Sequence, residues 1–303
     1  MFLHWLKIVQ SQLIVMKFLV IGNITKDIIR TKKEEKHTFG GNASYSSITA
    51  VKLGCKTHVL SRGNNELSEW INVLKNHEID VELQKSDSIT CFVNDYTENE
   101  RKQSVLSDAG KIDYKSFGKV DVIFLGPVFN EITLECLKKA RKDCKILSLD
   151  TQGFVRTLKN KEVVKKFWDD RDEFLKYVDL LKVGRDEINS ISKEKDYEKV
   201  CEELRSLGVK VVELTLGENG SIIVGEEVHR IPAFKTKLVD KTGSGDVFAT
   251  AFAIRYLESK NELESGLFAS AAASFVVEDF GTKNIAEREK VMKRFEELSK
   301  MIK

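Results

Sequence analysis

The amino-acid sequence predicts an α/β fold, in which helices cover both faces of a largely parallel sheet. Short apolar runs rich in β-branched residues alternate with amphipathic helical patterns along the chain. Such alternation is typical of parallel strands joined by helical crossovers. Glycines and acidic residues follow several of the runs, among them Gly22, Asp150 and Gly184. Because parallel strands end at one edge of a sheet, we expect these residues to share a rim where ligands bind.

The predicted strands are short and apolar, as buried strands of parallel sheets usually are. In chain order they span residues 18–21, 57–60, 122–125, 146–149, 180–183, 211–214 and 221–224. Segments with helical periodicity lie between and after them. The predicted helices cover residues 42–53, 66–77, 131–142, 161–177, 185–191, 196–207, 246–259, 262–279 and 286–302.

Two polar segments with alternating character depart from this pattern, residues 24–39 and 82–108. We interpret them as short antiparallel strands that form a small β lid over the rim, with ordinary surface hairpins as the alternative. Residues 1–15 are apolar but too short and interrupted to span a membrane, and Met16 begins the first strand pattern. We therefore expect one domain over residues 1–303, of which residues 1–15 are an extension of uncertain status.

Composition excludes several classes of function. The chain of 303 residues carries 49 basic and 47 acidic residues, a net charge of +2. This balance gives no electrostatic reason to expect a nucleic acid or a membrane as partner. The five cysteines form no C-x-x-C pair, and the five histidines show no zinc-ligand spacing. The cysteines predict free thiols in a reducing cytoplasm.

Residues 240–248 form the most informative motif, Asp-Lys-Thr-Gly-Ser-Gly-Asp-Val-Phe. Gly243, Ser244 and Gly245 allow a tight turn and leave their N–H groups uncovered before a predicted helix. Unpaired N–H groups and the helix dipole together make such a helix start an anion site. Asp246 is placed beside that site to take a proton from a nucleophile. The combination indicates phosphoryl transfer, and an ordinary turn with a capping Asp is the alternative.

Two N-terminal segments carry groups suited to a hydroxyl-rich ligand. Gly40 and Gly41 precede a helical pattern that Asn42 opens. Paired glycines there allow close backbone approach to a small ligand. Asp27 follows the first strand, and its carboxylate can accept hydrogen bonds from two vicinal hydroxyls. A plain loop-to-helix turn and an ordinary surface Asp are the alternatives.

Two later segments indicate where a phosphate donor would bind. The polar turn from Thr215 to Gly220, with Gly217 between them, joins two predicted strands and can pass beneath a nucleotide. A simple hairpin would have the same pattern. Glu187 follows the strand at 180–183 and can hold Mg²⁺ through water, because that ion keeps several waters. A partner for the helix dipole is the other interpretation of Glu187.

In this order and spacing, the segments resemble the PfkB, or ribokinase-like, carbohydrate kinase family from about Met16 to the C-terminus. Gly40-Gly41, with the helix that ends at Leu53-Gly54, looks like the first family signature. The second signature, D-[TSK]-T-G-[AS]-G-D, is met by residues 240–246. A Thr-x-Gly-x-x-Gly turn and a late alanine-rich helix are also similar to the family. They lie at Thr215, Gly217 and Gly220, and at residues 269–273 with Gly281.

The resemblance implies a ribokinase-like three-layer α/β/α fold and a kinase that uses ATP and Mg²⁺. Asp246 would be the catalytic base, and Gly243, Ser244 and Gly245 would form the anion hole. The implied substrate contacts are Asp27, Gly40, Gly41, Asn42 and Tyr45. The implied nucleotide contacts are Lys182, Thr215, Gly217, Gly220, Thr242 and Ser270. Glu187 would support Mg²⁺ through water, and Asp240 would help to hold a monovalent cation, K⁺, as in some members.

Three positions depart from the family pattern. Tyr45 replaces an Asn that usually contacts the substrate, which argues against simple ribose specificity. Gly184 stands where the family often has an Asn, three residues before Glu187, which weakens the assignment of metal binding there. Lys241 replaces the usual Thr, and its charge is either solvated or close to the nucleotide phosphates.

The segment 150–156, Asp-Thr-Gln-Gly-Phe-Val-Arg, resembles the D-x-Q-G-F-x-R stretch of a family branch that includes myo-inositol kinases. Asp150, Gln152 and Arg156 offer acceptors and donors suited to a polyhydroxylated ring. A purely structural loop is the competing interpretation. We therefore predict that the acceptor is a sugar or cyclic polyol, with a myo-inositol-like compound favoured.

The sequence thus predicts a cytoplasmic ATP-dependent kinase that acts on a small hydroxyl compound. Exposed edges of the lid sheet would allow a homodimer. A nucleoside kinase on the same fold is the nearest alternative, and a non-catalytic sugar-binding protein is another. A dinucleotide-dependent dehydrogenase is disfavoured, because no G-x-G-x-x-G spacing follows Gly22.

Overall fold

The computed structural model describes residues 15–98 and 102–302, so the expected extension at 1–15 lies almost wholly outside the described residues. A nine-stranded sheet forms the centre of the protein. Its strands, in spatial order, are β15 (Val228–Ile231), β14 (Ser221–Val224), β13 (Val211–Thr215), β12 (Leu180–Gly184), β9 (Cys144–Asp150), β8 (Val120–Leu125), β1 (Lys17–Ile21), β4 (Lys56–Gly63) and β5 (Asp80–Lys85).

Neighbouring strands from β12 to β5 and the pair β12–β13 are parallel, whereas β14 and β15 are antiparallel. Each strand predicted from the sequence is present in this sheet. The side chains of β1 show why its run is apolar throughout. Phe18 and Val20 pack into one hydrophobic cluster, whereas Leu19 and Ile21 pack into a second cluster. Since successive side chains of a strand point to opposite faces, both faces of the sheet are buried.

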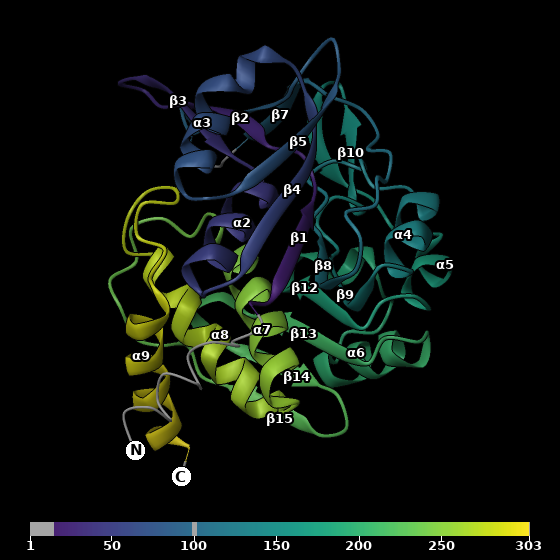
Figure 1. Ribbon diagram of the computed structural model, residues 1–303, viewed down its shortest axis with the longest axis vertical. Coiled ribbons are helices and arrows are strands. Elements are labelled where there is room, and N and C mark those ends of the chain that lie inside the picture. Colours follow the sequence, from purple (N-terminus) through teal and green to yellow (C-terminus); the bar gives the residue numbers. More distant parts are fainter. Residues whose placement is uncertain (1–14, 99–101, 303) are drawn as a thin grey trace, which may run out of the picture.

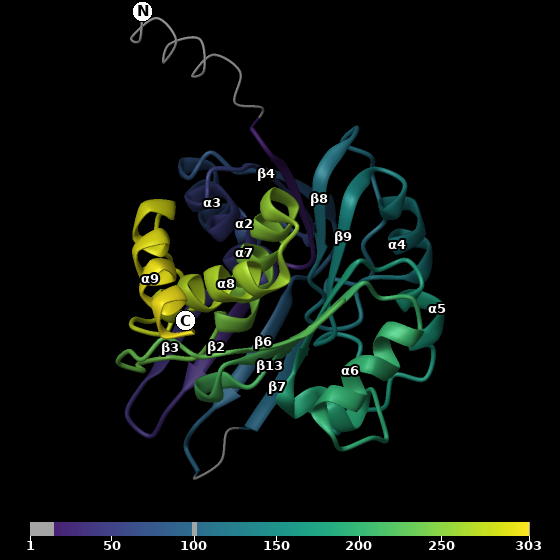
Figure 2. The same ribbon diagram turned by 90° about the horizontal axis from the view of Figure 1, so that it is seen from below.

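Helices cover those two faces in separate layers (Figures 1 and 2). On one face lie α2 (Asn42–Lys52), α3 (Ser68–Asn76), α7 (Ser244–Ser259), α8 (Glu262–Val276) and α9 (Arg288–Met301). On the other face lie α4 (Leu134–Arg141), α5 (Arg171–Leu175) and α6 (Tyr197–Ser206). Short 3₁₀ turns complete the connections: η2 (Asn65–Leu67), η3 (Arg185–Ser190) and η4 (Gly217–Asn219). The predicted three-layer α/β/α arrangement is confirmed.

A second, six-stranded sheet lies at the edge where the strands of the main sheet end (Figure 1). Its spatial order is β10 (Arg156–Lys159), β11 (Glu162–Lys165), β7 (Lys102–Ser107), β6 (Thr90–Asp95), β2 (Thr25–Arg30) and β3 (Glu35–Gly40). The predicted lid segments supply four of these strands, β2, β3, β6 and β7. The expectation of purely antiparallel pairing is wrong, because β2 and β6 are parallel. Residues 82–85 belong to β5 of the main sheet rather than to the lid.

The prediction of a helix over residues 161–177 is also wrong for most of that range. The apolar residues there fit helical spacing, but Asn160 and Lys161 adopt φ values of 52° and 68° and close a two-residue hairpin turn. Consecutive positive φ angles match the twist of a hairpin, so the β-branched pair Val163–Val164 continues as strand β11. Only the five-residue α5 remains helical in this stretch.

The five cysteines all carry free thiols, as the sequence predicted. Within residues 15–98 and 102–302, no helix combines the length and the hydrophobicity needed to cross a bilayer.

Candidate active site

The glycine motif, residues 240–245, forms the loop before α7, which we call the anion loop after its predicted role. The side chain of Asp240 accepts hydrogen bonds from the N–H and the hydroxyl of Thr242, at 3.0 and 2.7 Å. This turn leads into Gly243, which caps α7 with a φ of 78°. Gly245 and Asp246 lie in the first turn of α7, where a helix has no backbone partner for its N–H groups. Those donors and the helix dipole favour an anion.

Gly243 is required for a second reason besides its positive φ. A Cβ atom on this residue would lie 2.2 Å from Cδ1 of Tyr45, far inside contact distance. The ring of Tyr45, on α2, therefore packs directly against the anion loop. Tyr45 is 4% exposed, and burial together with the charges of Asp246, Asp240 and Asp27 raises the pKa of its hydroxyl. The departure from the family Asn thus places an aromatic ring against the loop.

Asp246 is half-buried in the first turn of α7. The amide of Asn42 donates a hydrogen bond to its Oδ1 atom at 2.8 Å. Burial, followed by the negative charge of Asp150, raises the pKa of Asp246 to about 7, although Lys182, Arg156 and the Asn42 hydrogen bond act in the opposite direction. A carboxylate with a pKa near neutrality can accept a proton during a reaction and release it afterwards.

A row of buried ionisable side chains lies beneath the loop, across neighbouring strands. Lys182 on β12 is in register with Asp150 on β9 and Glu213 on β13. The Lys182 Nζ atom lies 3.2 Å from Oδ2 of Asp150 and 3.8 Å from Oε2 of Glu187. A Cβ atom added to Gly245 would lie 3.3 Å from this Nζ atom, so the ammonium group lies next to the anion loop.

This arrangement keeps Lys182 positively charged. Burial disfavours the ammonium form, but the carboxylates of Asp150, Glu187 and Asp246 more than offset it and raise the pKa of Lys182. The predicted role of Lys182 at a phosphate therefore has a geometric basis. Asp150 is fully buried beneath the loop and paired with Lys182, so it lies away from the surface where the sequence placed it as a substrate contact.

Glu213 is a buried acid that the sequence reasoning missed. Its side chain is 0% exposed, and neither carboxyl oxygen has a hydrogen-bond partner among the described residues. Burial and the nearby charge of Asp150 raise its pKa well above the ordinary value. A single acidic residue inside an otherwise apolar strand that ends at the rim was the signal available in the sequence.

Glu187 lies in η3, directly after β12, and its carboxylate is hydrogen-bonded to neighbouring residues. Its Oε2 atom accepts hydrogen bonds from the N–H of Gly184 at 2.7 Å and from the hydroxyl of Thr151 at 2.8 Å. Burial opposes its charge, but Lys182 and these donors lower the pKa of Glu187 overall. Within the described chain, no cluster of three or more His, Cys, Asp or Glu side chains is arranged to hold a metal by itself. A single carboxylate beside phosphates nonetheless suits Mg²⁺.

The predicted substrate contacts Asp27, Gly40 and Asn42 lie on β2, on β3 and at the start of α2. The hydroxyl of Thr25 donates to Oδ1 of Asp27 at 3.0 Å, and a Cβ atom on Gly40 would lie 3.4 Å from Oδ2 of Asp27. Gly41 has a φ of 81°, and a Cβ there would meet the carbonyl oxygen of Asn23 at 2.4 Å. Gly41 therefore lets the chain turn closely past Asn23 into α2, whereas a side chain at Gly40 would make only an ordinary contact with Asp27.

The segment 150–156 connects the main sheet to the lid. The N–H of Gln152 donates to Oδ1 of Asp150 at 2.8 Å. Arg156 starts β10, and its guanidinium donates to the carbonyl oxygen of Val128 at 3.1 Å. Its charge is close enough to lower the pKa of Asp246. Arg156 thus reaches the same site as Asp246, although the two residues are far apart in the sequence.

Two of the predicted nucleotide contacts, Gly220 and Ser270, lie against the segment that joins β15 to the anion loop. A Cβ atom on Gly220 would lie 2.0 Å from the carbonyl oxygen of Ile231, at the start of this segment. The hydroxyl of Ser270 donates to the carbonyl oxygen of Pro232 at 2.7 Å. The segment then runs into the anion loop through Thr242, whereas Thr215 and Gly217 lie at the end of β13 and in η4.

Comparisons with known proteins agree with this geometry. The model of the pfkB family of carbohydrate kinases matches residues 15–289. The chain belongs to the PfkB family. Members of this family are kinases that transfer a phosphoryl group to sugar hydroxyls, so the sequence-based assignment to a phosphotransferase is confirmed, as is the ribokinase-like fold.

Two relatives of this PfkB kinase illustrate the range of its similarities. A nucleoside kinase from Methanothermobacter thermautotrophicus is 29% identical over 281 residues, which cover 87% of this chain and 86% of that protein. A pyrophosphate-dependent kinase in the ribokinase family, solved with a pyrophosphate analog and myo-inositol, superposes with a TM-score of 0.81 at 25% identity. That superposition covers 91% of this chain and 99% of the other.

Proposed function

We propose that this PfkB kinase uses ATP and Mg²⁺ to phosphorylate a hydroxyl of a cyclic polyol or sugar, with a myo-inositol-like acceptor favoured. The observation that carries the proposal is the meeting of Asp246, the α7 anion loop and the Lys182 ammonium group at one point. Asp27 and Arg156 flank this point from the lid side and offer an acceptor and a donor for ring hydroxyls.

In the proposed reaction, the acceptor hydroxyl lies between Asp27 and Asp246. Its O–H bond breaks as the proton passes to Asp246, and its oxygen forms a bond to the terminal phosphorus of the donor. The bond from that phosphorus to the leaving oxygen breaks in line. The N–H groups of the loop and Lys182 stabilise the charge on the transferring group. Mg²⁺ near Glu187 would neutralise further charge on the phosphates, and Asp240 would be a ligand for K⁺.

An apolar rim favours a nucleotide over pyrophosphate as donor. Leu238, Val239 and Phe280 are 60%, 37% and 62% exposed. The N–H of Val239 donates to the carbonyl oxygen of Val277 at 2.7 Å, which brings the segment before the anion loop beside the end of α8. Exposed apolar side chains next to a phosphate site suit a base. Pyrophosphate has no group that would use them.

The choice of acceptor rests on the segment 150–156 and on its similarity to myo-inositol kinases. The myo-inositol complex of the similar kinase supports this choice. A nucleoside is the second candidate, because nucleoside kinases from Methanothermobacter thermautotrophicus and Methanocaldococcus jannaschii are 29% and 25% identical to this chain.

A donor-by-acceptor screen tests the proposal. ATP and pyrophosphate are each combined with myo-inositol, ribose, fructose, phosphorylated sugars and nucleosides, and ³¹P NMR detects the phosphorylated product. We expect turnover with ATP and a polyol or sugar. Turnover with pyrophosphate alone would overturn the donor assignment, and turnover with nucleosides alone would overturn the acceptor assignment. Binding of a polyol without turnover would indicate a sugar-binding protein.

The proposal includes a cytoplasmic enzyme that pairs through its lid. Free thiols support the location, and the lid sheet ends in two edge strands, β3 and β10. Unpaired strand edges are able to pair with a second copy of the chain. Light scattering coupled to size-exclusion chromatography would report a dimer, and a monomer at all concentrations would contradict this part of the proposal.

A further inference from the structure

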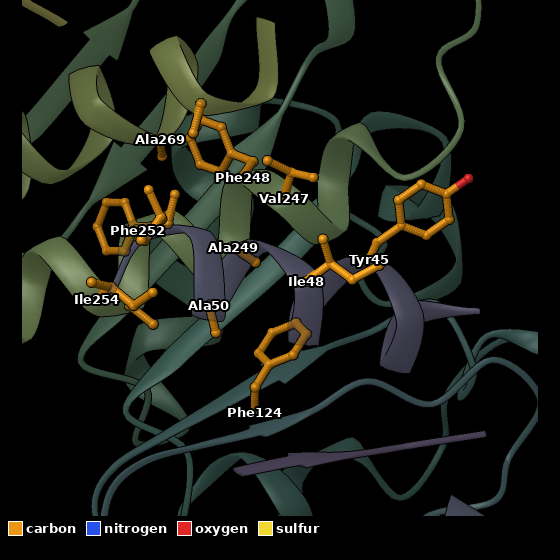
Figure 3. Close-up of a cluster of buried hydrophobic side chains, with 14 of the residues drawn as sticks. Tyr45, Ile48, Ala50, Phe124, Val247, Phe248, Ala249, Phe252, Ile254 and Ala269 are labelled. Carbon is orange, nitrogen blue, oxygen red and sulfur yellow. The ribbon is translucent and has the colours of Figure 1, made fainter. Parts of the chain in front are cut away.

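Asn42 has a place in the site that differs from a substrate contact. It is the first residue of α2 and is only 1% exposed. Figure 3 shows α2 and α7 packed side by side, with Ile48 and Ala50 on one helix near Val247 and Ala249 on the other. This packing brings Asn42 to the start of α7, where its Nδ2 atom lies 2.8 Å from Oδ1 of Asp246.

The orientation of the Asn42 amide is fixed from its other end. The hydroxyl of Ser46, one helical turn later and fully buried, donates to Oδ1 of Asn42 at 2.9 Å. An amide whose oxygen accepts from Ser46 must present its NH₂ group to the carboxylate. A Cβ atom on Gly126 would lie 1.9 Å from Oδ1 of Asn42, so the missing side chain at Gly126 leaves the room that this oxygen occupies.

We infer that Asn42 is a positioning residue for the catalytic base, an inference that rests on the proposed role of Asp246. Its amide holds Oδ1 of Asp246, while Oδ2 has no hydrogen-bond donor among the described residues and is left to receive the proton of the acceptor hydroxyl. A hydrogen bond to a carboxylate also favours its charged form, the form that accepts a proton.

A titration distinguishes this role from simple packing. The other groups that face Asp246 are Asp150 on β9, Lys182 on β12, Arg156 on β10 and Tyr45 on α2. None of them changes in an Asn42→Ala variant. Because the Asn42 hydrogen bond lowers the pKa of Asp246, its loss raises that pKa. The deprotonated base is then populated only at higher pH, so the acidic limb of the pH profile moves upward.

The experiment compares pH profiles of kcat/KM for wild type, Asn42→Ala and Ser46→Ala, with the best donor and acceptor from the screen. We expect the acidic limb of Asn42→Ala to rise by on the order of one pH unit, with a further loss of roughly 10-fold in kcat from misorientation. Ser46→Ala should shift the limb in the same direction by less, and it keeps the test available if Asn42→Ala does not fold.

Ser47→Ala is the matched control. Ser47 is also fully buried on α2, but its hydroxyl donates to the carbonyl oxygen of Ser44 and does not reach Asn42. The acidic limb of the pH profile of Ser47→Ala should stay at the wild-type position. Unmoved limbs in both Asn42→Ala and Ser46→Ala would overturn the inference and leave Asp246 as the base. Full turnover by Asp246→Asn would instead remove the proposed function and the inference with it.

Discussion

Two carboxylates at the carboxyl ends of main-sheet strands have opposite surroundings. Glu131 follows β8 and is 1% exposed. Its oxygens accept hydrogen bonds from the backbone N–H groups of Asn23, Val128 and Phe129, at distances between 2.8 and 3.0 Å. Asp246, at the start of α7, accepts one hydrogen bond from a side-chain amide.

The difference separates a structural acid from the proposed catalytic base. Glu131 joins the turn after β1 to the turn after β8. Both of its carboxyl oxygens accept hydrogen bonds from backbone N–H groups of these turns. Burial raises the pKa of both carboxyl groups, that of Asp246 to about 7. The difference is that Asp246 keeps an oxygen available for a substrate proton under the proposed mechanism. A carboxylate whose oxygens all accept hydrogen bonds stabilises the fold, whereas one with an oxygen left over can still accept a proton from a substrate.

The largest expected effect is on activity, in the Asp246→Asn variant. Asparagine keeps the shape of the side chain and can still accept the Asn42 hydrogen bond, but it cannot take a proton. Turnover should fall by about 10²–10⁴-fold, the contribution of a positioned base. Because the raised pKa makes the ionised form unfavourable in the folded protein, stability should be equal or greater above pH 7.

Steady-state kinetics and thermal unfolding measure both halves of this prediction. Wild-type turnover in Asp246→Asn would show that the proton leaves by another route. A large loss of stability would place Asp246 in the same class as Glu131 and remove the contrast between the two sites.

The reverse pattern is expected for Glu131→Gln. The new NH₂ group would face backbone N–H donors and leave at least one of them without an acceptor, which costs about 1–3 kcal/mol for a buried group. The melting temperature should fall by several degrees, while kcat of the folded fraction stays unchanged. Differential scanning calorimetry with parallel kinetics checks this. A fall in kcat without loss of stability would show that Glu131 acts in the reaction.

The contrast also explains what the sequence alone could and could not predict. Gly243 and Gly41 were identifiable because their backbone requirement is local, and the apolar runs of the main sheet identified its strands. The Asn42–Asp246 contact joins residues 204 positions apart, so no local pattern carries it. The hairpin at Asn160–Lys161 was missed because helical spacing of nearby apolar residues hid a turn made without glycine.

For the same reason, the proposed donor side of the site is easier to infer from the sequence than the proposed acceptor side. The loop at 240–246 and the turn at 215–220 are contiguous motifs. The acceptor side instead combines residues from β2, α2 and β10, and their meeting depends on how the lid sheet pairs. Asp150 illustrates the limit, because its position after a strand indicated the rim but not that Lys182 would enclose it.

Glu213 provides the smallest and most selective test of the comparison. It is buried like Glu131 but has no hydrogen-bond partner among the described residues, and burial raises its pKa. A folded-state pKa above the unfolded value means that stability is lost as pH rises from the ordinary value toward the raised one. Glutamine has nearly the shape of the protonated glutamic acid and cannot ionise, so Glu213→Gln should not lose this stability as the pH rises. The melting temperature of Glu213→Gln should therefore match wild type near pH 4 and exceed it by a few degrees at pH 8.

Unfolding curves collected across this pH range measure the difference, with Glu131→Gln as the control that should be less stable at pH 8. A Glu213→Gln variant that loses stability at every pH would show that Glu213 is ionised and paired. In that case the row Asp150–Lys182–Glu213 would hold a second carboxylate against the ammonium group, and less positive charge would remain for a phosphate. In that case, kcat of Glu213→Gln would rise, because the Lys182 ammonium group would have one carboxylate fewer beside it. If Glu213 is neutral, kcat of Glu213→Gln equals that of the wild type.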